Sequence, residues 1–193
     1  FYSLEISRFQ KTEFNIIEDN NFFSNDSIAF RINSKINSTK FIEILNGIDI
    51  NIELKYLKSN QFFGSAIYIS EIQEYLPNII EGRYFNLDDF KMNIPVAVIG
   101  TELLNYTILE NDERYLLVDE IKYKVIGVMG GEDSICNDRF FINLNSYLLY
   151  SKEFLELDDF YNVDLKYSEA DILEKLEEEI LMYDKANEIL KYS

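Results

Sequence analysis

The chain of 193 residues is long enough for one large domain or two small ones, and its 47% hydrophobic content supplies a packed core. Its formal net charge of -17 repels phosphate backbones and anionic lipid head groups, which argues against nucleic-acid binding. The chain contains no histidine and a single cysteine, Cys136, so it lacks imidazole chemistry and an intramolecular disulfide. Any catalysis would therefore use carboxylates, lysine, tyrosine or Cys136.

The first third predicts a strand, helix, strand unit. Residues 28–33 alternate as a strand, and a short helix follows that Ser38 or Thr39 can cap. Gly47 supplies a left-handed residue that ends this helix. Apolar and polar residues then alternate over residues 48–56, which predicts a half-buried strand.

The middle of the chain predicts mostly strands. Residues 64–69 form a strand, and Ser70 with Gln73 has capping-box spacing for a helix over 72–80 that Gly82 ends. Residues 96–99 predict a buried strand that leads into a short helix over 101–104. Residues 115–128 predict two strands joined at Asp119-Glu120, and a loop over 130–134 closes the block.

The last third resembles the first in its element order. Residues 140–142 are expected to be extended, 145–150 helical, and 163–167 a strand. Ser168 and Asp171 form a capping-box-like start to a long helix with acidic residues on one face. The two outer segments are expected to share one sheet under one layer of helices, with the middle block as an insertion.

An ordered set of short motifs carries a family resemblance. It comprises Gly82-Arg83, the acidic residue at Asp88 or Asp89, the segment from Pro95 to Gly100, and the strand that contains Gly127. In this order and spacing the chain resembles the extracytoplasmic core domain of ABC-transporter permeases of the MacB/FtsX superfamily. The resemblance implies that six family-motif residues have a structural role: Gly82, Arg83, Asp88, Pro95, Gly100 and Gly127.

The resemblance implies an α+β fold in two parts. A porter-like α/β subdomain would comprise residues 1–75 and 138–193, and an inserted, mostly β, Sabre-like subdomain would comprise 76–137. The family usually carries glycines before and within the hairpin, where this chain has Asn111-Asp112-Glu113 and Asp119-Glu120. These two loops therefore depart from the family pattern.

The resemblance also implies a function. The chain would be a non-catalytic domain on the extracytoplasmic face of a bacterial plasma membrane, coupling ATP-driven helix motion to the export or handling of a peptide, lipoprotein or other amphiphile. Its partners would be transmembrane helices of the same permease, a cytoplasmic ABC ATPase that holds the ATP, and a second permease copy. The domain itself would need no cofactor, and its acidity favours a cationic peptide as ligand.

Two further observations bear on this expectation. No segment approaches the roughly 18 apolar residues of a membrane span. The chain begins with Phe1, as expected for a loop between two transmembrane helices, and Phe1-Tyr2 and Tyr192 would suit a membrane interface.

Other sites have plainer interpretations. The acidic loops at 86–89, 110–113 and 132–133 offer Ca²⁺ ligands, but none has EF-hand spacing and solvated turns are favoured. Cys136 is expected to be buried and unreactive, because no histidine can activate it. Two alternatives stay open: a surface-anchored binding domain outside any transporter, and a carboxylate enzyme with two convergent acids of raised pKa.

Overall fold

The computed structural model describes residues 23–24, 26–32, 34–74, 76–132, 134–156 and 159–191, with side chains described up to Tyr183. The expectations for Phe1-Tyr2, Asn33 and Tyr192 lie outside these residues. Within them the fold is α+β, with one large sheet and few helices. The strands are β1 Ser27–Phe30, β2 Asn51–Ser59, β3 Phe62–Ile69, β4 Ile79–Gly82, β5 Val96–Gly100, β6 Ile108–Glu110, β7 Glu113–Val118, β8 Ile121–Met129, β9 Arg139–Asn143 and β10 Tyr161–Asp164. The helices are α2 Ser38–Asn46, α3 Leu144–Ser151 and α4 Ile172–Lys191, with 3-10 turns at η1 Leu87–Phe90, η2 Thr101–Tyr106 and η3 Leu165–Tyr167.

The described strands form a single sheet in the order β1-β10-β2-β3-β9-β5-β8-β7-β6, and β4 also pairs with β8. The parallel pairs are β3 with β9 and β5 with β8. Strands from both ends of the chain lie side by side, because β10 pairs between β1 and β2. The division into residues 1–75 with 138–193 and 76–137 stays a prediction.

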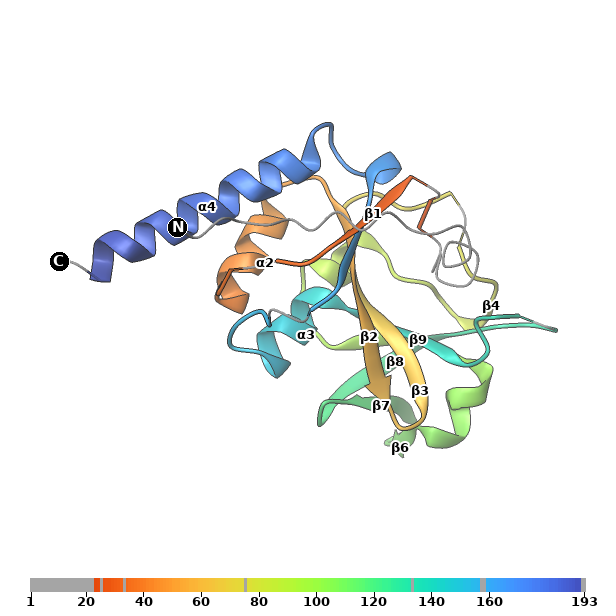
Figure 1. Cartoon of the computed structure of the whole chain (residues 1–193). Helices are drawn as coiled ribbons and strands as arrows, with labels where there is room; N and C mark the ends of the chain where they lie inside the picture. The colour runs from red at the N-terminus through yellow and green to blue at the C-terminus, as the bar shows by residue number, and fades with distance from the viewer. Residues whose placement is uncertain are drawn as a thin grey trace.

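The three helices lie on the same side of strands β1, β2 and β3 (Figure 1). Beneath them, paired residues of adjacent strands present one continuous apolar face. Tyr161 lies at its centre, stacked on Phe30 and in edge contact with Phe41 of α2, each at a centroid separation of 5.8 Å. All three rings are buried, so the contact fixes α2 on the outer strands of the sheet.

The structure confirms most of the predicted elements. Strands β3, β5 and β9, the β7–β8 hairpin and helices α3 and α4 lie where the periodicity placed them. Asp119 and Glu120 have φ of 46° and 66°, and Asn111 and Asp112 have φ of 49° and 63°. Positive φ at both central residues is the requirement of a type I′ hairpin turn, so both glycine-free loops still make tight turns.

The helix predicted over 72–80 is wrong. The chain leaves β3 as a loop because Asn51 Oδ1 accepts hydrogen bonds from the backbone N–H groups of Ser70 and Glu71. Pro77 lies inside the predicted helix, and it disfavours helical geometry at the preceding residue. The chain then enters strand β4, which contains Gly82 at φ 72°.

Four smaller predictions about element ends are also wrong. Asn37, not Ser38 or Thr39, caps α2, and Gly47 has φ -95°, which is not left-handed. The strand predicted over 163–167 ends at Asp164, whose carboxylate accepts from the Lys166 N–H and starts η3. Ser168 does not cap α4, because its hydroxyl donates to the Asp164 carbonyl instead.

Candidate functional site

Arg83 and Asp89 form the centre of the family-motif region. The two guanidinium nitrogens of Arg83 donate to the two carboxylate oxygens of Asp89 at 2.6 and 2.9 Å. The same carboxylate accepts from the backbone N–H of Asn86, whose own side chain caps η1. The hydrogen bond to Asp89 raises the pKa of Arg83. A bidentate pair of this geometry fixes the turn after β4.

The two acidic candidates for this motif position make different contacts. Asp89 holds Arg83 and is buried, whereas Asp88 contributes its backbone N–H to the side chain of Asn86. Asp88 stays a family-motif prediction without a contact to Arg83.

Gly82 and Gly127 lie opposite each other in the antiparallel pair of β4 and β8. They face each other in the sheet register, and Arg83 N–H donates to the carbonyl of Ile126. A Cβ at Gly127 would overlap the carbonyl oxygen of Arg83, and a Cβ at Gly82 would overlap that of Ile126. Glycine is needed at both positions so that the two backbones can meet.

Pro95 and Gly100 mark the two ends of β5. The Pro95 carbonyl accepts from the Lys124 N–H of β8, and Gly100 closes the strand before η2. Both residues therefore have structural positions, and neither presents a reactive group.

Sequence reasoning missed the residue that ties this region to the rest of the sheet, Asn143. Its side chain is fully buried at the end of β9. Its Oδ1 accepts from Val96 N–H, and its Nδ2 donates to the carbonyls of Asp89 and Ile94. The available signal was an asparagine directly after an apolar strand, where side chains commonly satisfy backbone groups.

The second face of the outer strands carries buried polar side chains. Glu53 and Lys55 of β2 were predicted to face solvent, but they are 0% and 6% exposed. Their charged groups lie 3.5 Å apart, and Asn162 Nδ2 of β10 donates to Glu53. Burial raises the pKa of Tyr84, and the nearby Glu53 raises it further. The turn after β4 therefore lies close to this polar face.

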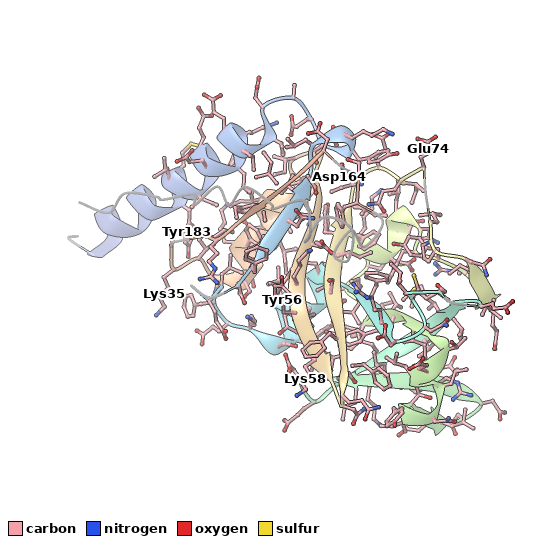
Figure 2. All side chains as sticks on the ribbon, turned by 45° about the vertical axis from the view of Figure 1, so that its right-hand side comes forward. Lys35, Tyr56, Lys58, Glu74, Asp164 and Tyr183 are labelled. Atoms are coloured by element: carbon pink, nitrogen blue, oxygen red, sulfur yellow. The ribbon has the colours of Figure 1, made fainter. Side chains whose placement is uncertain are left out.

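A cavity of about 720 Å³ opens beside the β2–β3 hairpin. Its buried lining includes Lys55, Phe62 and Ser65. The exposed lining includes Tyr56 and Phe63, which are 59% and 58% exposed. The remaining lining residues are Gln61, Gly64, Glu102, Asp138 and Arg139. Tyr56 lies on the lower half of β2 in Figure 2. This volume is in the range of ordinary small-molecule sites.

The acidic loops have local roles within the described residues. Glu110 and Glu113 pair with Lys122 and Lys124 across the β6, β7 and β8 strands. Asp133 lies outside the described part of the chain. In the described part, no group of three or more cysteine, aspartate or glutamate side chains comes together as a metal site.

Few groups have the character of a catalytic centre. Burial raises the pKa of the Cys136 thiol, which is 5% exposed. The carboxyls of Glu113 and Glu169 have lowered pKa values because lysines donate hydrogen bonds to them. A carboxylate enzyme is expected to have two convergent acids of raised pKa, and these groups do not form such a pair.

No protein-family model matches the chain, and no curated protein matches it. Two solved structures are similar to it. The extracellular domain of the noncanonical ABC-type transporter YknZ from Gram-positive bacteria is 14% identical, with a TM-score of 0.42, over 75% of this chain and 84% of that one. The periplasmic region of MacB from Actinobacillus actinomycetemcomitans is 11% identical, with a TM-score of 0.44, over 83% of this chain and 84% of that one. The domain type of both is the one that the sequence resemblance named.

Proposed function

We propose that the chain is the extracytoplasmic domain of an ABC-transporter permease of the MacB/FtsX superfamily, on the outer face of a bacterial plasma membrane. It has no enzymatic activity of its own and couples ATP-driven motion of transmembrane helices to the export or handling of a peptide, lipoprotein or other amphiphile. A cytoplasmic ABC ATPase binds the ATP, and two permease copies form the working dimer. The high negative charge favours a cationic peptide as the ligand.

The observation that carries the proposal is the attachment of α4. Ile172, Leu176 and Ile180 are each 1% exposed, so the first half of the helix is docked on the core. The helix continues to Lys191 and extends past the remaining elements (Figure 1). A helix of 20 residues measures about 30 Å, so movement at its free end is carried as a lever to its docked end.

The base of this lever is joined to the sheet. Glu169 N–H donates to the Asp49 carbonyl at 2.8 Å, and Asp49 N–H donates to the Glu169 carboxylate. Asn51 N–H donates to the Ser168 hydroxyl, which in turn donates to the carbonyl of Asp164. The segment before α4 therefore contacts β2 and β10 together, so displacement of the helix is transmitted to two adjacent strands of the sheet.

Among the described residues, no helix combines the length and the hydropathy needed to cross a bilayer. The proposal therefore depends on the parent polypeptide, and the test uses that polypeptide in its own cells. A Met92→Cys variant is made in a Cys136→Ala background, because Met92 is 51% exposed and Cys136 is buried. We expect a membrane-impermeant maleimide to label this variant on intact cells.

The matched control keeps Met92 and Cys136, and Cys136 should be labelled only after denaturation because its thiol is buried. Labelling of Met92→Cys only after the cells are opened would contradict the extracytoplasmic location. If the variant is labelled on intact cells but the parent polypeptide has no second membrane span, the result would favour the surface-anchored binding domain instead.

A further inference from the structure

The cavity beside the β2–β3 hairpin presents two aromatic rings to solvent. Tyr56 and Phe63 belong to adjacent strands, and more than half of each side chain is exposed. An aromatic side chain that is left in water forgoes much of the favourable free energy of burial. At a cavity, such side chains often contribute most of the binding free energy. The cavity floor, by contrast, is buried and polar at Lys55 and Ser65.

Tyr56 has an unusual backbone conformation. Its φ is 65°, and it lies in a β-bulge between Leu54 and Leu57 where the pairing of β2 with β3 shifts register. The left-handed region is unfavourable for a bulky residue, and bulges redirect side chains near functional sites. A tyrosine is thus held in a costly conformation in which its ring lies 5.7 Å from the ring of Phe160 and the residue stays 59% exposed. Such strain is typical of sites that bind ligands.

The charges at the cavity favour a positive ligand. The ammonium of Lys55 is neutralised by Glu53 at 3.5 Å. Glu102 and Asp138 are exposed in the lining, where Arg139 is the other cationic side chain. The lining therefore contains two exposed carboxylates and one guanidinium, in a protein whose formal net charge is -17. Carboxylates combined with exposed aromatic rings are the groups that recognise organic cations.

We propose that this cavity binds a small organic cation, an amine or other positively charged group on an apolar body. The positive group lies near Glu102 and Asp138, and the apolar body contacts the rings of Tyr56 and Phe63. This site goes beyond the proposed function, and its failure would leave the assignment as a permease domain standing.

The test compares two probe ions of similar size and opposite charge, tetraphenylphosphonium and tetraphenylborate. Each is titrated into the 193-residue chain by isothermal calorimetry and by NMR of the tyrosine and phenylalanine rings. We expect saturable one-site binding of tetraphenylphosphonium, and at least about tenfold weaker binding of tetraphenylborate. Equal affinity for both ions, or non-saturable binding of the cation, would overturn the proposal.

Variants then locate the bound cation. Tyr56→Ala and the double variant Glu102→Gln with Asp138→Asn should each weaken its binding about tenfold. The control Tyr150→Ala removes another half-exposed ring, outside the cavity lining, and should leave the affinity unchanged. Unchanged affinity in both cavity variants would overturn the site.

Tyr56→Gly separates binding from folding. Glycine adopts φ of 65° without steric strain, so this variant should unfold at the same or a higher temperature. It should nevertheless lose the same affinity as Tyr56→Ala. A folded Tyr56→Gly protein that binds tetraphenylphosphonium normally would show that the strained ring serves no ligand.

Discussion

Replacing Asn143 by aspartate is expected to lower the free energy of unfolding by about 4 kcal/mol. The Nδ2 group of Asn143 donates to the carbonyls of Asp89 and Ile94, and a carboxylate cannot donate to either. The change also introduces an unpaired charge at a fully buried position. Equilibrium urea unfolding measures the loss.

The matched control makes the same substitution at Asn93, which is exposed and accepts a hydrogen bond from Asn145. Aspartate can still accept this bond, so Asn93→Asp should change the free energy of unfolding by less than about 0.5 kcal/mol. A loss below about 1 kcal/mol for Asn143→Asp would contradict the role assigned to its amide.

Gly127→Ala is expected to cost about 3 kcal/mol. The new Cβ overlaps the Arg83 carbonyl oxygen, and this neighbour is the backbone directly after the paired strand β4. Relief therefore requires β4 to separate from β8, which also displaces the Arg83–Asp89 pair that follows. Chemical denaturation measures the cost.

Gly47→Ala provides the comparison. A Cβ at Gly47 meets its nearest atom at 3.5 Å, which is ordinary contact, and its φ is -95°. This variant should be neutral or gain up to about 1 kcal/mol through loss of unfolded-state entropy. Similar losses in the two variants would show that the backbones at Gly127 and Arg83 are not in close contact.

The sequence correctly predicted the helices, strands and turns that are determined by residues close together in the chain. The strand at residues 64–69, the acidic and apolar faces of α4, and the pair Asp119-Glu120 between two strands all depend on nearby residues. The helix expected over 72–80 failed because Asn51, about 20 residues earlier in the chain, holds the loop after β3. A capping-box pattern cannot reveal such a distant competitor.

The same limit applies to the candidate site. The Gly82-Arg83 motif and its acidic partner were visible as residues, but the choice of Asp89 over Asp88 depends on the turn geometry of η1. Glu53 and Lys55 were predicted to be exposed because they alternate with apolar residues. They are buried with Asn162. A local sequence pattern does not show which other elements cover a face of the sheet.

The backbone strain at Tyr56 was also beyond local reasoning. Tyrosine is a favourable strand residue, so its position in β2 predicted ordinary extended geometry. The register shift between Leu54 and Leu57 comes from pairing with β3, and only the structure shows it.

The most direct test of the central claim is a disulfide between the segment just before α4 and the segment just before β2. Asp49→Cys and Glu169→Cys, in the Cys136→Ala background, place two thiols where the backbones are hydrogen-bonded at 2.8 Å. The full permease is reconstituted with its ATPase, and ATP hydrolysis is measured before and after oxidation. The control pair Leu117→Cys and Lys122→Cys joins β7 to β8 and leaves α4 unrestrained.

If α4 transmits motion by pivoting at this joint, the oxidised Asp49–Glu169 pair should lower ATP hydrolysis about fivefold or more, and reductant should restore it. The β7–β8 pair should leave the rate unchanged. Complete formation of the α4 disulfide with an unaltered rate of hydrolysis would contradict the account.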